Sequence, residues 1–143
     1  MYKHAYRVLI ALTLFAGLMV PASQAQSIML KADIPFDFVV GDKHLSSGEY
    51  HVKSMHQFAT LVQSMDGRSS AIVLTTPTQS AKVSDTGKLL FNRYGDQYFL
   101  SKIWAASSDT GRELRKSKLE REVAQGFSTS GTSIVAAKTE PRK

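Results

Sequence analysis

The segment from residue 28 to residue 40 constrains the fold more than any other part of the chain, because apolar residues recur there at every second position. Seven even-numbered positions are apolar: Ile28, Leu30, Ala32, Ile34, Phe36, Phe38 and Val40. A period of two is typical of a strand with one buried face and does not fit the roughly 3.6-residue period of a helix. Pro35 donates no ladder hydrogen bond, so it predicts an edge strand or a break between two short strands.

Further strands are predicted along the next 64 residues, with turn residues between them. The segments are 49–54, 58–64, 70–75, 89–93 and 97–104. Segment 70–75 carries apolar residues on both faces, which predicts a central strand, and Pro77 is expected to end it. Residues 78–87 are polar and are expected to form a loop. The pattern predicts a mainly β fold, a small antiparallel β-sandwich or barrel of about six to seven strands.

The pattern changes after Trp104, where charged residues replace the alternation. Thr110 with Glu113, and Ser117 with Glu120, each fit a capping box at the start of a helix. We therefore expect a charged C-terminal helix over about 113–125, ended by Gly126. Residues 127–143 are expected to be a flexible tail, within which 134–137 could form one short strand.

The first 25 residues read as a secretory signal peptide, with Lys3 and Arg7 ahead of an apolar stretch and Ala25 at the expected cleavage site. The exported protein would then be periplasmic or secreted. Residues 26–126 would form a single domain. No later segment has the roughly 20 apolar residues of a membrane span, so we expect no transmembrane anchor after cleavage.

Charge and cysteine content narrow the chemistry. The full chain has 18 Lys and Arg against 12 Asp and Glu, and the leader removes two bases, so the exported part carries 16 − 12 = +4. This mild excess favours anionic partners but does not indicate nucleic acid. With no cysteine, the chain has no disulfide, thiol nucleophile or thiolate metal site.

No motif points to an enzyme or to a cofactor, and we expect neither a catalytic set nor a bound metal. His44, His51 and His56 are spaced by seven and five residues, and neither spacing places two histidines on one face of a helix or strand. There is no nucleophile elbow and no glycine-rich phosphate loop. A small hydrolase remains an alternative if a histidine meets a carboxylate in a cleft.

Two surfaces are candidate contacts for a ligand or partner. One is the predicted hairpin at 93–98 and the other is the basic start of the predicted helix. The candidate residues are Arg93, Tyr94, Asp96, Tyr98, Arg112, Arg115 and Lys116. Arg93 and Asp96 could pair across the hairpin, and the charges of the helix could simply be a solvated face.

Two blocks of the sequence carry a resemblance. They are Ile34-Pro-Phe-Asp-Phe-Val-Val-Gly41 with Leu45-Ser-Ser-Gly-Glu-Tyr-His-Val52, and Leu90 to Leu100 continuing to Leu114. The chain resembles a family of small, exported, uncharacterised bacterial proteins frequent in soil acidobacteria. It departs from that pattern at Ser46-Ser47, where Pro-Ala is usual, and at Arg115, where Pro is expected. The resemblance implies a β-rich exported protein and no particular activity.

The expected function is therefore that of an exported, non-enzymatic β domain that binds an envelope or extracellular protein or polymer. One alternative is an assembly subunit in which residues 28–40 form an edge strand that completes a neighbouring sheet. The small hydrolase is the third. The sequence names no ligand.

Overall fold

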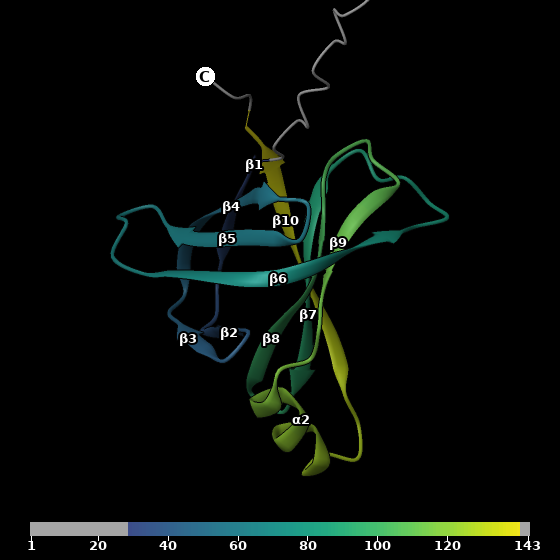
Figure 1. Cartoon of the computed structure of the whole chain (residues 1–143). Coiled ribbons are helices and arrows are strands. Elements are labelled where there is room, and N and C mark those ends of the chain that lie inside the picture. Colours follow the sequence, from purple (N-terminus) through teal and green to yellow (C-terminus); the bar gives the residue numbers. More distant parts are fainter. Residues whose placement is uncertain (1–28, 141–143) are drawn as a thin grey trace, which may run out of the picture.

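The computed structural model describes residues 29–140 and shows an antiparallel β-barrel of eight strands (Figure 1). Around the barrel the order is β1 (Met29–Ile34), β4 (Gly48–His56), β5 (Ala59–Ser64), β6 (Ser70–Gln79), β9 (Thr110–Leu114), β8 (Gln97–Trp104), β7 (Gly87–Tyr94) and β10 (Gly131–Thr139). The ring closes because β9 pairs with both β6 and β8, and β10 pairs with both β7 and β1. The mainly β prediction is confirmed, and the fold is a barrel. The proposed signal peptide lies outside the described residues.

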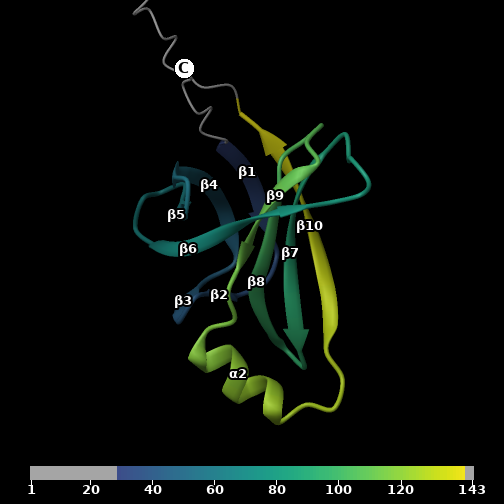
Figure 2. The same cartoon turned by 45° about the vertical axis from the view of Figure 1, so that its right-hand side comes forward.

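Two elements pack against one end of the barrel, as Figure 2 shows. The ribbon of β2 (Phe38–Val40) and β3 (Lys43–Leu45) joins β8 through a parallel pairing of Val39 with Phe99. The helix α2 (Lys118–Gln125) connects β9 to β10. With β2, β3, β9 and β10, the described chain has ten strands, more than the six to seven expected.

The alternating apolar side chains of β1 and β2 point into the interior of the protein. Leu30, Ala32 and Ile34 are 2% exposed or less, and so are Phe38 and Val40. Pro35 falls between β1 and β2, so the predicted break is confirmed. The predicted free edge is wrong, because β1 pairs with β4 on one side and β10 on the other.

Pro77 does not end its strand, contrary to expectation. Thr75 donates its backbone N–H to the carbonyl of Phe58, so the nitrogen of Pro77, two residues on, points to the same side. Strand β5 begins at Ala59, which pairs with Leu74, so β5 has no residue opposite Pro77 whose carbonyl would need an N–H from position 77. Pro77 pairs instead with Arg112 of β9, and β6 continues to Gln79.

The outer face of β6 also differs from expectation. The strand is paired on both sides, but Ile72 and Leu74 are 63% and 78% exposed. No described segment covers them. Large apolar side chains left in water are unusual enough to suggest a contact surface.

The predicted helix begins five residues too early. Residues 110–114 form β9, which pairs on both sides, so the capping box of Thr110 and Glu113 is wrong. Of the second box the N-cap half is confirmed, because the Ser117 hydroxyl accepts a hydrogen bond of 3.1 Å from the N–H of Glu120. The Glu120 carboxylate does not complete the box, since its Oε1 accepts from Asn92 and Tyr94 instead. Pairing partners distant in the sequence outweigh the local capping pattern here.

The prediction of a flexible tail after Gly126 is wrong, because most of this segment forms a strand. Strand β10 runs from Gly131 to Thr139, and its inward residues Val135 and Ala137 are 8% and 4% exposed. The short strand expected at 134–137 is its central part. The barrel cannot close without it, since β10 is the strand between β7 and β1.

Candidate functional site

A groove of about 450 Å³ lies where β6 and the chain leaving β9 diverge. We call it the basic groove. Its lining consists of Gly41, Phe58, residues 73–76, residues 113–118 and Arg121. Gly41 comes from the β2–β3 turn, and Lys118 and Arg121 come from the first turn of α2. Phe58 and Leu74 are 54% and 78% exposed, so the lining of the groove includes large apolar side chains that water can reach.

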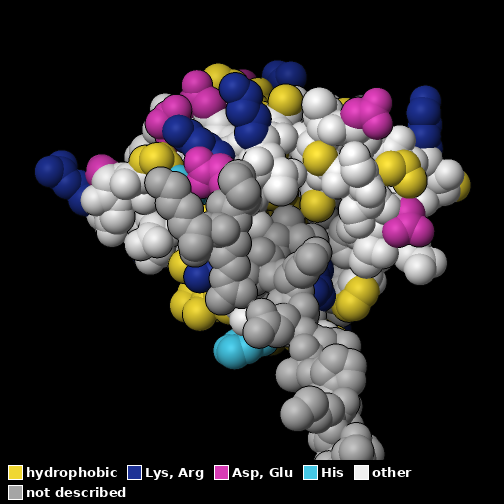
Figure 3. Space-filling view, turned by 90° about the horizontal axis from the view of Figure 1, so that it is seen from above, with side chains coloured by type: hydrophobic (Ala, Val, Ile, Leu, Met, Phe, Trp, Pro, Cys, Tyr) yellow, Lys and Arg dark blue, Asp and Glu magenta, His cyan; other side chains and the backbone are white. Residues whose placement is uncertain are grey.

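Four cationic side chains and one carboxylate line the basic groove. The carboxylate, Glu113, lies 3.7 Å from Lys102, and Lys118 lies 3.9 Å from Glu122. Arg115 and Arg121 form no ion pair within residues 29–140. At the opposite end of the barrel, basic and acidic side chains lie next to one another (Figure 3). The groove is therefore a local excess of positive charge, which favours an anionic partner.

A buried polar cluster holds α2 against the barrel and so places the cations of the helix. Glu120 is 4% exposed, and its Oε1 accepts hydrogen bonds from Asn92 at 2.7 Å and from the Tyr94 hydroxyl at 3.2 Å. Lys116 donates to the same hydroxyl at 3.2 Å. This hydrogen bond raises the pKa of the Lys116 ammonium above its usual value. Leu119, Val123 and Ala124 pack beside the cluster on Val39, Tyr94 and Phe99.

Replacing Glu120 with Ala is expected to lower the free energy of unfolding by about 1–3 kcal/mol, because the partly buried Asn92 amide and the buried Tyr94 hydroxyl would lose their shared acceptor. Glu120→Gln keeps an acceptor oxygen and is expected to cost less. Glu122→Ala is the matched control on the same helix, since its carboxylate is exposed, and should change stability by about 0.5 kcal/mol or less. Urea unfolding measures all three. Equal losses for Glu120→Ala and Glu122→Ala would contradict the anchoring role.

The structure separates the seven candidate contact residues into different places. Tyr94 is only 3% exposed and lies beneath α2, so it cannot line a rim. Arg93 donates to the carbonyl of Gly95 at 2.8 Å and lies 5.6 Å from the ring centre of Tyr98, and it forms no ion pair with Asp96 in the described chain. The expected Arg93–Asp96 pair is therefore wrong. Tyr98 stacks on Phe36, with ring centres 3.8 Å apart, and packs against the core.

The remaining candidates face two different hollows. Arg115 and Lys116 line the basic groove. Arg112 does not, because it lies on β9 opposite Ile103, where its side chain enters the end of the barrel. Sequence reasoning missed Phe58 and Leu74 as site residues. The only signal for Leu74 was an apolar residue on each face of its strand.

A second hollow, of about 220 Å³, brings Asp96 and Tyr98 together with Asp37 and His44. Asp37 accepts a hydrogen bond of 2.8 Å from the backbone of Ser47. No hydrogen bond joins His44 to a carboxylate within residues 29–140. This hollow therefore collects the residue types of a hydrolase without the hydrogen bond between base and carboxylate that would orient them.

The other two histidines lie on β4, away from that hollow. His51 Nε2 is 3.9 Å from the carboxylate of Glu140, and His56 is the last residue of the strand. Within the part of the chain that the structure describes, no three His, Cys, Asp or Glu side chains gather as metal ligands would.

Among residues 29–140, the structure contains no helix of the length and apolar character needed to span a bilayer.

Comparisons with protein-family models, with curated proteins and with solved structures found no match to this chain. The class of protein therefore follows from fold and site alone. It is a small eight-stranded antiparallel β-barrel that carries a ribbon, a helix and a basic groove at one end.

Proposed function

We propose that the protein is an exported, non-enzymatic binding module that attaches to the cell envelope by placing its basic groove on an anionic lipid surface. One observation carries this proposal: unpaired cations and exposed apolar side chains share a single groove. Export is supported by the features of residues 1–25, and the resemblance to small exported bacterial proteins agrees with it. The absence of recognisable catalytic motifs in the sequence supports a binding role.

The apolar side chains favour a lipid surface over a soluble anionic polymer. A polymer needs only the cations, whereas Leu74 and Phe58 would stay in water beside it. At a bilayer, apolar groups enter the boundary between headgroups and acyl chains while cations contact the anionic headgroups. Ile72, two residues before Leu74 on the same outward face, extends the apolar contact. The two kinds of side chain would then be stabilised by one partner.

The test compares binding to phosphatidylglycerol-containing vesicles and to phosphatidylcholine vesicles, by sedimentation of the purified protein. We expect binding to the anionic vesicles only. Each cation at such a surface contributes about 1 kcal/mol, so Arg115→Glu with Arg121→Glu should weaken binding by about 30-fold or more. Leu74→Ser should also weaken it.

The matched control is Lys82→Glu with Lys138→Glu, which changes the net charge equally at exposed positions outside the groove. Its affinity should remain much closer to that of the unmodified protein. Equal weakening by both pairs would mean that net charge alone acts, and the groove would lose its role. Binding to a soluble anionic polymer that is as strong as binding to vesicles, and indifferent to Leu74→Ser, would overturn the lipid surface as partner.

A further inference from the structure

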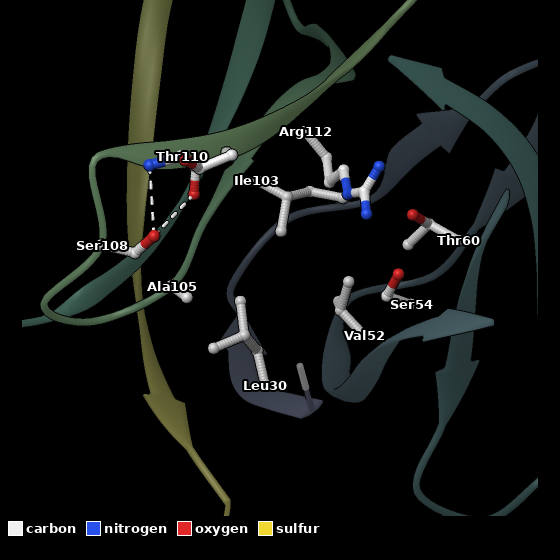
Figure 4. Close-up of a pocket in the computed structure, with 10 residues that line it drawn as sticks. Leu30, Val52, Ser54, Thr60, Ile103, Ala105, Ser108, Thr110 and Arg112 are labelled. Atoms are coloured by element: carbon white, nitrogen blue, oxygen red, sulfur yellow. Dashed lines mark hydrogen bonds between the residues drawn. The ribbon is translucent and has the colours of Figure 1, made fainter. Parts of the chain in front are cut away.

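A separate cavity lies at the end of the barrel formed by the start of β1, the end of β4 and the β8–β9 connection (Figure 4). It measures about 90 Å³ and is mainly apolar. Leu30, Val52, Ile103 and Ala105 supply its hydrocarbon walls. Eight-stranded barrels have an interior just wide enough either for side chains or for one small ligand. The cavity here is of the size of one small ligand.

Arg112 brings a charge into that cavity. It lies on the inward face of β9, opposite Ile103 of β8, and Figure 4 shows its guanidinium reaching toward Thr60 and Ser54. One of its nitrogens donates to the carbonyl of Gln57. Arg112 forms no ion pair within the described chain. A guanidinium has five N–H donors, so most remain available beside an apolar wall.

The hydroxyl groups around the cavity are already engaged within the protein. Thr60 and Thr75 share a hydrogen bond of 3.1 Å, and Ser54 donates to the carbonyl of His56 at 3.3 Å. Ser108 exchanges hydrogen bonds with the backbone of Thr110, drawn as dashed lines in Figure 4. The strongest free donor facing the cavity is therefore the guanidinium, whose planar fork matches a carboxylate.

We propose that this cavity binds a short-chain carboxylic acid, with its carboxylate on Arg112 and its hydrocarbon against Leu30, Val52 and Ile103. Because a cavity of about 150 Å³ holds benzene, one of 90 Å³ fits a chain of about four carbons. An apolar pocket with one well-placed charged group is the usual form of a small-ligand site. The inference does not depend on the basic groove, which uses other residues.

The experiment is a titration of the full chain with butyrate at neutral pH, followed by NMR of the methyl groups. We expect saturable shifts at the methyls of Leu30, Val52 and Ile103. Butanol has the same chain length without the charge and should bind at least about tenfold more weakly. Acetate has the charge without the hydrocarbon chain and should leave the chemical shifts of these methyl groups unchanged. Absence of shifts with butyrate, or equal shifts with acetate, would overturn the proposal.

Two variants separate the parts of the proposed site. Arg112→Gln should weaken butyrate binding at least about tenfold, whereas Arg115→Gln, a loss of charge outside the cavity, should not. Ala105→Leu fills the cavity from the connecting segment while keeping Arg112, and should abolish the inner shifts. Unchanged binding by either cavity variant, with the fold verified from its NMR spectrum, would place the carboxylate elsewhere. Vesicle binding of these variants reports separately on the proposed function.

Discussion

Ending the chain after Gly126 is expected to leave a protein that does not fold. The truncation removes β10, which pairs with β7 from Gly131 to Ala137 and with β1 from Ala137 to Thr139. Both neighbours would become unpaired edges, and the barrel would open along its length. The expected loss is the whole free energy of unfolding, about 5–15 kcal/mol for a typical domain. Circular dichroism and urea titration should show no cooperative transition.

A stop after Glu140 is the matched control for this truncation, because it keeps all of β10, and its urea midpoint should not change. Two point variants test the same strand in the intact chain. Val135→Asp places a carboxylate in the core and should cost about 3–5 kcal/mol, whereas Ile134→Asp, at a residue that is 64% exposed, should cost about 1 kcal/mol or less. Similar costs for the two substitutions would contradict the position of β10 in the barrel.

The strands that could be predicted are those whose signal is local. Residues 30–40 alternate regularly enough that Leu30, Ala32 and Ile34 could be placed on the buried face from the sequence alone, although Val39 on the other face is buried as well. In the predicted strand 49–54, Tyr50 and Val52 are likewise buried. The hairpin glycines also have a local reason. Gly67 and Gly95 adopt positive φ angles of 71° and 60°, which glycine tolerates without cost, and both lie in turns that were predicted.

Strand β9 could not be predicted, and β10 could be predicted only in its central residues 134–137, because the stabilising partners of both strands are remote in the sequence. Residues 110–114 look like the start of a helix until β6 and β8 are placed beside them. Gly111 shows the tertiary cause: a Cβ there would lie 2.5 Å from the ring of Trp104 and 2.7 Å from the carbonyl of Ile103. Glycine at position 111 allows β8 and the Trp104 ring to approach the backbone of β9 closely. Because glycine is uncommon in strands, the residue that permits this packing does not itself predict a strand.

The same distinction divides the candidate site. Arg115 and Lys116 are neighbours in sequence, so their charge could be recognised before the fold was known. Phe58 and Leu74 join them only through the barrel. From the sequence, Arg112 and Arg115 are equivalent basic residues. Because residues 110–114 form a strand, alternate side chains point into the barrel, and Arg112 is one of them. Arg112 therefore lines the cavity and not the basic groove.

Replacing Phe91 with Ala is expected to lower the free energy of unfolding by about 3–5 kcal/mol. Phe91 is fully buried, and its ring meets Phe36 edge to face at 5.1 Å and Phe38 at 5.6 Å between ring centres. Removing it leaves a cavity where β7 and the β1–β2 segment meet, and those rings cannot fill it without losing their own contacts. Urea unfolding monitored by circular dichroism measures the loss, which is a large part of the stability of a small domain.

Phe58→Ala is the matched control, because Phe58 is 54% exposed and its truncation leaves no internal cavity. It should change stability by about 1 kcal/mol or less, yet it should weaken binding to anionic vesicles. Phe91→Ala that remains folded should keep its vesicle affinity, since Phe91 does not line the basic groove. The two phenylalanines therefore separate the core that holds the barrel together from the surface proposed to bind lipid. A Phe58→Ala loss as large as that of Phe91→Ala would contradict this separation.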